Sequence, residues 1–324
     1  EKVGSKTKKI LFVCFLLICF IFINNSSIFV SKSGRPYLLA HRGLAQTFPM
    51  EGLTADTNTA AIIYEPEHPY LENTIASMQA AFAAGADIVE LDIQLTKDGQ
   101  FAVFHDWLLD YRTNGSGAVR EYTLKELKQL DIGYGYTADN GRTYPFRGKG
   151  VGLMPALEEV LAAFPEQELL LHLKSEDKEA GEKLADYLST LPTDRLKLLS
   201  VYGADGPIAV LQERLPDLRV MSKATMKRAL LSYLLIGWTG YIPRSLRNTQ
   251  LHLPINYACF LWGWPHRFVQ RMDTVNTRII IVNGSGKWSE GFDTKEDLQK
   301  LPKDYSGGIW TNRIDIIAPF FKDK

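Results

Sequence analysis

The sequence predicts an α/β protein whose main domain is a (β/α)₈ TIM barrel. Short apolar segments alternate with amphipathic ones from Tyr37 onward, and strands that alternate with helices favour a parallel sheet. Eight strands are counted when the extra strand after the Lys97–Gly99 turn is set aside, which fits a barrel of about this length. The alternative is a doubly wound open sheet, but no glycine-rich phosphate-binding turn follows the first strand.

The periodicity of apolar residues places the individual elements. The first helix is expected within residues 72–87, with Asn73 or Thr74 near its N-cap and Gly85 at its end. Further helices are expected over 123–130, 154–164, 180–191, 206–215, 265–272 and 294–301. The eight strands are expected to start near Tyr37, Asp87, Glu168, Leu196, Leu218, Ile255, Thr277 and Gly307.

The N-terminus predicts a membrane helix. Four lysines within residues 2–9 precede fourteen apolar residues, 10–23, and the stretch extends to Val30, which reaches the length of a spanning helix. Bulky residues at 28–30 favour an uncleaved signal anchor over a cleaved signal peptide. We expect a cytoplasmic basic segment at 1–9, a single transmembrane helix at 10–30 and a linker at 31–36. The barrel, 37–324, then lies on the extracytoplasmic side.

Composition excludes some functions. Lysine and arginine together number 37, as do aspartate and glutamate, so the basic excess of a nucleic-acid-binding protein is missing. Three cysteines make no disulfide framework. The oligomeric state is not predicted.

Titratable residues stand at the ends of several expected strands, where active groups of such barrels lie. His41 and Arg42 end the first strand, and Glu90 and Asp92 share one face of the second. If the 97–99 turn folds the chain back, position 90 lies opposite about 106, and 92 opposite about 104. His105 then lies beside the two carboxylates.

His172 and Lys174 share the same i, i+2 spacing on a later strand. Two neighbouring carboxylates repel each other, so a divalent cation such as Ca²⁺ or Mg²⁺ would stabilise them. Two histidines beside it suit general acid and base roles, and an arginine with a lysine suits a phosphate. Each residue alone also fits a structural histidine or a solvated strand face.

The chain resembles the glycerophosphodiester phosphodiesterase family (GDPD) from about Tyr37 to its C-terminus. The specific motifs are HRG at 41–43, ENT at 72–74, ELDIQLTKDG at 90–99 and VFHD at 103–106. Weaker matches include MPALEEVL at 154–161, HLK at 172–174, IVNG and WTNR.

This resemblance implies a barrel of the phospholipase-C-like (PLC-like) phosphodiesterase type that uses a divalent cation, usually Ca²⁺ or Mg²⁺. It would cleave glycerophosphodiesters to glycerol 3-phosphate and an alcohol, with a hydroxyl of the substrate's own glycerol attacking phosphorus. The implied roles are acid/base catalysis by His41 and His105, metal binding by Glu90 and Asp92, phosphate and substrate contacts by Arg42 and Lys174, and a supporting role for Glu72.

Two departures from the family pattern stand out. The family usually has glutamate as a third metal ligand where this chain has His172; imidazole can replace it but prefers softer metals than Ca²⁺. An insertion at about 44–70 follows the first motif and is expected either to shape the alcohol pocket or to decorate the surface.

Three alternatives remain open from the sequence. The substrate is either a soluble glycerophosphodiester or a membrane lysophospholipid, which would make the enzyme a lysophospholipase D. In the second alternative, the barrel is a degenerate binding protein that has lost catalysis. The segment 226–247, with an apolar centre flanked by cations, is either an interfacial membrane segment or a helix packed on the barrel wall.

Overall fold

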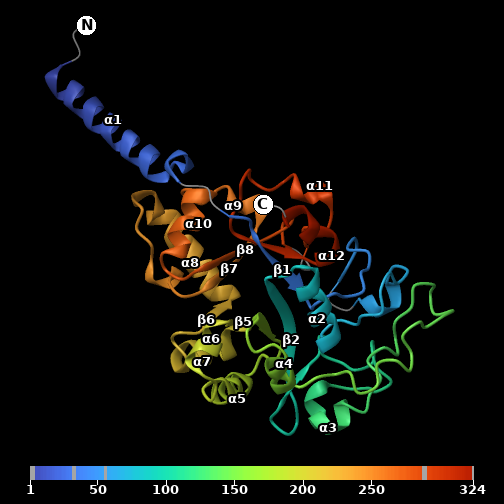
Figure 1. Ribbon diagram of the computed structural model, residues 1–324. Helices are drawn as coiled ribbons and strands as arrows, with labels where there is room; N and C mark the ends of the chain where they lie inside the picture. Colours follow the sequence, from blue (N-terminus) through green and yellow to red (C-terminus); the bar gives the residue numbers. More distant parts are fainter. Residues whose placement is uncertain (1–3, 31–33, 55–56, 287–289, 323–324) are drawn as a thin grey trace.

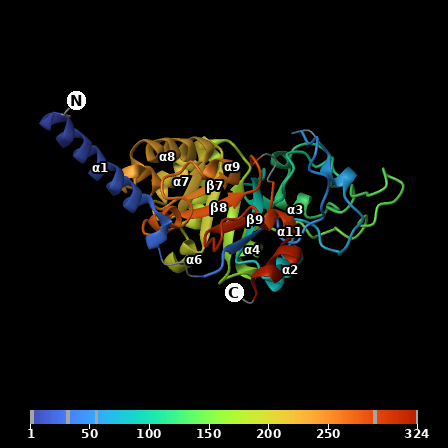
Figure 2. The same cartoon turned by 90° about the horizontal axis from the view of Figure 1, so that it is seen from above.

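The computed structural model describes residues 4–30, 34–54, 57–286 and 290–322. Within them, eight parallel strands curve into a barrel with helices outside (Figures 1 and 2). The predicted fold class is confirmed. The strands are β1 Tyr37–His41, β2 Ile88–Leu95, β4 Glu168–Leu173, β5 Leu199–Gly203, β6 Arg219–Ser222, β7 Gln250–Pro254, β8 Arg278–Val282 and β9 Gly308–Thr311.

The strand order shows that the sheet is a nearly closed barrel. It reads β6-β5-β4-β2-β1-β9-β8-β7, and a single parallel bridge between Val220 and Thr249 joins the two ends. A doubly wound sheet would leave two free edges, so that alternative is wrong. The short strand β3, Phe101–Val103, pairs antiparallel with β2 outside the barrel order, as the Lys97–Gly99 turn predicted.

The helices alternate with the strands, as the periodicity predicted. The α-helices are α1 Ser5–Asn25, α2 Ile75–Ala84, α3 Leu124–Leu127, α4 Leu157–Ala163, α5 Lys178–Leu188, α6 Thr193–Lys197, α7 Asp205–Arg214, α8 Lys223–Ile236, α9 Ile255–Ala258, α10 His266–Asp273, α11 Lys295–Leu298 and α12 Ile314–Ile317. The 3₁₀ turns are η1 Ser27–Phe29, η2 Thr59–Ile62, η3 Val119–Glu121, η4 Gly237–Thr239, η5 Arg244–Leu246 and η7 Ala318–Phe321.

Helix α2 has the ends that its sequence predicted. The Thr74 side chain accepts from the Ser77 amide and Ser77 bonds back to the cap, which forms a capping box. At the other end Gly85 takes a left-handed conformation with φ of 119°, where a side chain would be strained. The capping box and the left-handed Gly85 set the first and last residues of α2. The chain therefore enters α2 from the loop at the barrel mouth and turns toward β2 after Gly85.

Two apolar layers hold the barrel together. Leu39, Leu170 and Trp310 belong to the cluster inside it. Their neighbours Leu38 and Leu171 point outward into the larger cluster between the sheet and the helices, because successive strand residues face opposite sides. A third cluster lies beneath the loop of residues 104–154, so this long segment is packed rather than loose.

Two expected strands differ from the structure. The strand expected near Ile255 is wrong, because Ile255–Ala258 is the short helix α9 and β7 is the preceding segment Gln250–Pro254. Proline lacks the amide hydrogen that a central strand needs, so β7 ends at Pro254. The strand expected near Leu196 starts at Leu199, because residues 193–197 form the one-turn helix α6.

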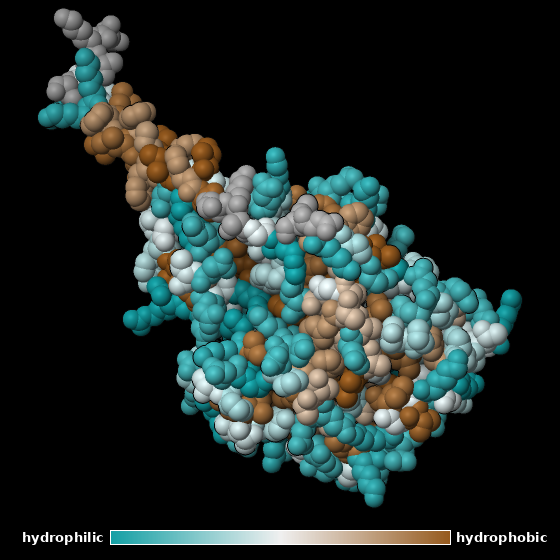
Figure 3. All heavy atoms as spheres, in the orientation of Figure 1, coloured by the Kyte–Doolittle hydropathy of each residue, from teal (hydrophilic) through white to brown (hydrophobic). Residues whose placement is uncertain are grey.

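Helix α1 extends from the barrel as an exposed apolar helix (Figures 1 and 3). Residues Lys6–Asn25 are long and apolar enough to cross a membrane, and none of this stretch is buried against the barrel. A signal sequence meets the same criteria. The helix ends at Asn25 rather than near Val30, where polar Asn and Ser side chains replace the apolar run. Parts of the expected basic segment (1–3), linker (31–33) and insertion (55–56) lie outside the described residues.

Candidate active site

The predicted site residues meet at the carboxyl ends of adjacent strands. In the barrel register His41 of β1 lies beside Glu90 of β2, and Asp92 of β2 lies beside His172 of β4. His172 in turn lies beside Tyr202 of β5. The hairpin register also matches the prediction, because Ile93 pairs with Val103 and the Phe104 amide donates to the Asp92 carbonyl.

Glu90, Asp92 and His172 form a cluster of potential metal ligands. Each offers one ligand atom, and these atoms lie within 4.8 Å of one another. Both carboxylates are fully buried. The His172 Nδ1 lies 2.8 Å from Asp92 Oδ1, and the Tyr202 hydroxyl donates to Glu90 Oε1 at 2.7 Å.

The electrostatics of this cluster fit a divalent cation. Burial raises the pKa of Glu90 to about 8, and the neighbouring Asp92 adds to the shift. Burial also opposes ionisation of Asp92, but Arg42 and His105 hold its pKa well below its usual range. At neutral pH one buried carboxylate is thus ionised and the other is protonated. A divalent cation could displace that proton and neutralise both carboxylates. Oxygen ligands suit Ca²⁺ or Mg²⁺, whereas the imidazole suits transition metals.

Arg42 is held by three acidic residues. Its backbone amide donates to Glu90 Oε2 at 3.2 Å, and its guanidinium lies 3.1 Å from Asp92 Oδ2 and 3.1 Å from Glu72 Oε1. Arg42 adopts a positive φ of 60° and Gly43 one of 80°. A Cβ at Gly43 would lie 2.8 Å from the Ser77 backbone carbon of α2, so the HRG motif needs glycine for this close approach.

His41 and His105 are each bonded through Nδ1, so both turn Nε2 toward the site. The Nδ1 of His41 lies 2.6 Å from Asn312 Oδ1, whose amide nitrogen donates to Asp293. The Nδ1 of His105 lies 2.7 Å from Asp106 Oδ1. Both partners are acceptors, so Nδ1 carries the proton and each Nε2 keeps its lone pair. Burial, reinforced by Arg42, holds the pKa of His41 well below normal and lowers that of His105 to about 4.

Lys174 is a second cationic side chain beside the two histidines and the carboxylates. Its Nζ lies 3.4 Å from His105 Nε2 and 5.4 Å from the centre of the Trp107 ring. Burial lowers the pKa of Lys174. The lysine and Arg42 therefore place two cationic side chains beside one histidine and one carboxylate pair.

A cavity of about 410 Å³ opens above these groups. His41, Arg42, His105, His172 and Lys174 all line it. Its other wall is largely apolar, and the insertion supplies part of that wall. The apolar lining residues are Phe48, Met50, Leu53, Trp107 and Leu108. The insertion thus lines the cavity; that this part of it receives the alcohol stays a prediction.

Glu72 lies behind the cavity in a network of ion pairs that the sequence did not predict. Arg112 donates to Glu72 Oε2 at 3.3 Å and also bonds to Asp106. Because Glu72 holds Arg42 and Asp106 holds His105, Arg112 connects the two sides of the site. The sequence analysis also did not single out Asn312, Asp106 and Tyr202, which bond to His41, His105 and Glu90, although the motifs WTNR and VFHD contain the first two.

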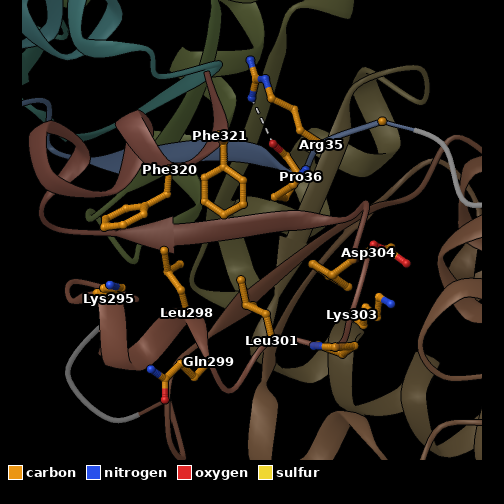
Figure 4. Close-up of a pocket in the computed structure, with 13 residues that line it drawn as sticks. Arg35, Pro36, Lys295, Leu298, Gln299, Leu301, Lys303, Asp304, Phe320 and Phe321 are labelled. Atoms are coloured by element: carbon orange, nitrogen blue, oxygen red, sulfur yellow. Dashed lines mark hydrogen bonds between the residues drawn. The ribbon is translucent and has the colours of Figure 1, made fainter. Parts of the chain in front are cut away.

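A larger cavity, of about 810 Å³, lies elsewhere on the barrel. Figure 4 shows its apolar lining by Leu298, Leu301, Phe320 and Phe321, with Lys295 and Lys303 nearby. None of the described residues that line it is a predicted site residue. Because the predicted site residues line the cavity of about 410 Å³, we place the candidate active site there.

The buried histidines predict acid-sensitive stability. Burial lowers the pKa of His41, His172 and His252, the last to about 3, and that of His105 to about 4. Between about pH 6.5 and 4 the unfolded chain then binds protons that the folded chain excludes, so the free energy of unfolding should fall as pH drops. Glu90, with its raised pKa, acts in the opposite direction but offsets only one such group.

Urea unfolding at pH 7, 6 and 5, in the presence of a chelator, measures this effect. Each buried histidine contributes at most about 1.4 kcal/mol per pH unit. The variant His252→Leu should show a shallower decline than the parent chain. A stability that stays constant or rises from pH 7 to 5 would contradict the assignment of neutral buried imidazoles.

The comparisons with known proteins decide the family. Residues 41–230 match the model of the glycerophosphoryl diester phosphodiesterase family. The chain belongs to this family. The match begins at His41 and includes the strands that carry Glu90, Asp92, His172 and Tyr202.

Relatives that carry this enzyme name match over part of their length. The chain is 39% identical over 153 residues to the glycerophosphodiester phosphodiesterase of Bacillus subtilis, covering 45% of this chain and 47% of the relative. It is 40% identical over 103 residues to that of Caldanaerobacter subterraneus, covering 32% of this chain and 39% of the relative. In these alignments the chain spans less than half the length of the relatives it matches.

Solved structures share the fold over nearly the whole domain. The glycerophosphoryl diester phosphodiesterase domain of Rv2277c from Mycobacterium tuberculosis aligns with a TM-score of 0.62 at 18% identity, covering 87% of this chain and 97% of that one. An Oleispira antarctica phosphodiesterase, solved with the product sn-glycerol-3-phosphate, aligns with a TM-score of 0.53 at 19% identity, covering 88% and 96%. At such identities the likeness shows the fold alone.

Proposed function

We propose that this chain is a metal-dependent phosphodiesterase that hydrolyses glycerophosphodiesters to glycerol 3-phosphate and an alcohol. The observation that carries the proposal is the shared cavity. His41, His105, Arg42 and Lys174 all border one space of about 410 Å³. His172 lines it as well, and it belongs with the buried Glu90 and Asp92 to the cluster of potential metal ligands. Family membership supports the same reaction.

The cationic side chains bind the phosphate in this proposal. Arg42 offers a planar guanidinium that is already held in place by Glu72 and Asp92, so little side-chain entropy is lost when the substrate arrives. Lys174 adds a point charge beside His105. Both groups favour the additional negative charge that develops on the phosphoryl oxygens during transfer.

The two histidines move the protons. A hydroxyl of the substrate's glycerol attacks phosphorus, and the Nε2 of one histidine accepts its proton. The other histidine, once protonated, donates to the leaving alcohol oxygen as the phosphorus–oxygen bond breaks, which leaves a cyclic phosphate on the glycerol. Water then attacks phosphorus in a second step in which the two histidines exchange roles. One takes the proton of the water, and the other donates to the ring oxygen that leaves, so that glycerol 3-phosphate is released. Asn312 and Asp106 keep each ring oriented through Nδ1. None of the described residues lining the cavity is serine or cysteine, which agrees with attack by the substrate itself.

Glu90, Asp92 and His172 would hold the divalent cation. A cation there would neutralise a phosphoryl oxygen and lower the pKa of the attacking hydroxyl. His172 stands where the family pattern has glutamate, so Mn²⁺ or Zn²⁺ competes with Ca²⁺ and Mg²⁺ for this site.

We also propose that α1 is a retained signal anchor, with the lysines in the cytoplasm and the barrel on the other side of the membrane. Arg271 of α10 is buried, and its guanidinium donates to the Asn24 carbonyl at 2.8 Å and to Asn25 Oδ1 at 3.0 Å. Removal of α1 would take away two of the acceptors of this buried guanidinium. The end of α1 is thus bonded into the fold.

An assay with several cations tests the proposed reaction. The full chain in detergent, stripped with a chelator, should hydrolyse glycerophosphocholine only after Ca²⁺, Mg²⁺, Mn²⁺ or Zn²⁺ is added, and should release glycerol 3-phosphate. Lysophosphatidylcholine in a parallel reaction measures the lysophospholipase D alternative. Calorimetric binding of a cation without turnover of either substrate would favour the degenerate binding barrel instead.

A further inference from the structure

The end of α8 carries an exposed apolar surface that the proposed reaction does not use. Large apolar side chains project there over one and a half turns of the helix and the loop that follows. We call this surface the α8 tip, which comprises Leu231, Leu234, Leu235, Ile236 and Tyr241. Their exposed fractions run from 38% for Leu234 to 76% for Leu235. Such a contiguous surface costs free energy in water and usually marks a contact site.

The α8 tip lies directly beside the end of α1. Figure 1 shows α1 reaching the barrel next to α8 and α10. The Asn24 and Asn25 side-chain amides donate to the Trp238 carbonyl at 3.0 and 2.8 Å. These bonds join the end of the membrane helix to η4, the turn in which α8 ends.

Arg271 fixes this junction from beneath. Besides its bonds to α1, its guanidinium donates to the Tyr233 hydroxyl at 2.9 Å and to the Gly237 carbonyl at 3.1 Å. One buried side chain therefore ties together α1, α8 and η4. Because α1 cannot turn freely about its end, a bilayer around α1 would stand at a fixed position relative to the α8 tip.

The charges around the α8 tip match a membrane surface. Residues 223–247 contain five cations and no acidic residue. Lys227 and Arg228 precede the tip, and Arg244 and Arg247 follow it. All four side chains are exposed. Apolar side chains between two sets of cations suit the boundary between acyl chains and phosphate-bearing headgroups.

We propose that the α8 tip inserts into the interface of the same bilayer that α1 spans. The docking depends on α1 being a membrane span and not on any catalytic role of the barrel. The two contacts act together, because once α1 is in place the tip binds a surface that is already adjacent. The segment 226–247 is thus an interfacial element as well as a helix of the barrel wall.

Docking in this way turns the barrel mouth away from the bilayer. Figures 1 and 2 both show α1 leaving on the side opposite the long loops 42–74 and 104–154, and residues of these loops line the active-site cavity. Taken together with the proposed function, this orientation means that a water-soluble glycerophosphodiester reaches the site more directly than a lipid in the same membrane.

Spin labels on the full chain test the docking. Single cysteines at 235 and 151 are made as Leu235→Cys and Val151→Cys in a background where Cys14, Cys19 and Cys259 are serine. Val151 is a matched control, because its side chain is 56% exposed. It belongs to the 104–154 loop, which Figure 1 shows on the side away from α1. A third label, Leu16→Cys, reports on α1 itself.

The chains are placed in nanodiscs of phosphatidylcholine and phosphatidylglycerol, and relaxation by oxygen and by a water-soluble nickel chelate is compared. We expect labels at 16 and 235 to favour oxygen several-fold over the label at 151. Equal ratios at 235 and 151, with a membrane ratio at 16, would overturn the docking. Spin–spin broadening at 235 would show instead that a second copy covers the tip.

A water-exposed label at 16 would overturn the proposal as well, because α1 would then not span the bilayer. Since the measurement does not depend on turnover, its failure is separable from failure of the proposed reaction. Leu235→Cys lies outside the cavity, and its activity on glycerophosphocholine should equal that of the parent.

Discussion

Replacing His105 by alanine should lower kcat about 10²- to 10⁴-fold while the chain stays folded. The Nε2 of His105 faces Lys174 inside the cavity, and its Nδ1 is bonded to Asp106. Alanine removes the proposed proton-transfer group and leaves Arg42 and the proposed metal ligands Glu90, Asp92 and His172 in the chain. His41→Ala should have an effect of the same size, because in the proposed reaction the two histidines transfer the two protons. The measurement is steady-state hydrolysis of glycerophosphocholine at saturating cation.

His68→Ala is the matched control for both variants. His68 lies in the insertion, where its ring contacts Gln46 and Tyr70 rather than the cavity groups, so kcat should stay near the parent value. Circular dichroism and urea unfolding verify that all three variants fold. Near-parent activity in His41→Ala and in His105→Ala would remove the acid/base assignment and leave the cavity without its proposed chemistry.

The barrel, and the part of the site formed by Glu90, Asp92 and His105, could be predicted from local sequence patterns. Strict alternation over β2 places Glu90 and Asp92 on one face, and the Lys97–Gly99 turn fixes the register that brings His105 near them. These inferences involve residues within about twenty positions of one another, where strand geometry alone decides the distance.

The remainder of the site depends on closure of the barrel. Asn312 lies 271 positions from His41 in sequence but bonds to its ring, and no periodicity in either segment indicates that contact. Arg112 comes from a loop whose path is set by packing of its own apolar cluster. The β7 error has a different cause, since an apolar run after Pro254 has the composition of a strand but forms one helical turn.

His172→Glu tests whether the departure from the family pattern changes the metal. Glutamate would offer an oxygen where the imidazole now lies beside Asp92. We expect this variant to keep cation binding and to shift its preference toward Ca²⁺ and Mg²⁺, because carboxylates favour hard cations. His172→Glu replaces one potential ligand by another, so the number of ligands stays the same. It is therefore the control for a variant, such as Glu90→Gln, that weakens a ligand.

Replacing Glu90 by glutamine should weaken cation binding roughly 100-fold or more, since loss of even an outer partner costs 10- to 100-fold. Glutamine has the shape of a protonated glutamate, and burial holds the pKa of Glu90 at about 8. At pH 7 most of the metal-free parent therefore already carries a neutral group there. The stability of the metal-free protein should change little while calorimetry shows the loss of affinity.

The same raised pKa gives the parent chain a pH dependence that the glutamine variant lacks. A cation must displace the Glu90 proton below about pH 8, so the apparent affinity of the parent should rise about tenfold per pH unit from 6 to 7. Asp92 is already ionised and His172 already neutral in this range, because their pKa values are lowered. A parent affinity that is flat between pH 6 and 7 would mean that Glu90 does not exchange its proton for the metal, and the cluster of Glu90, Asp92 and His172 would then not be the cation site.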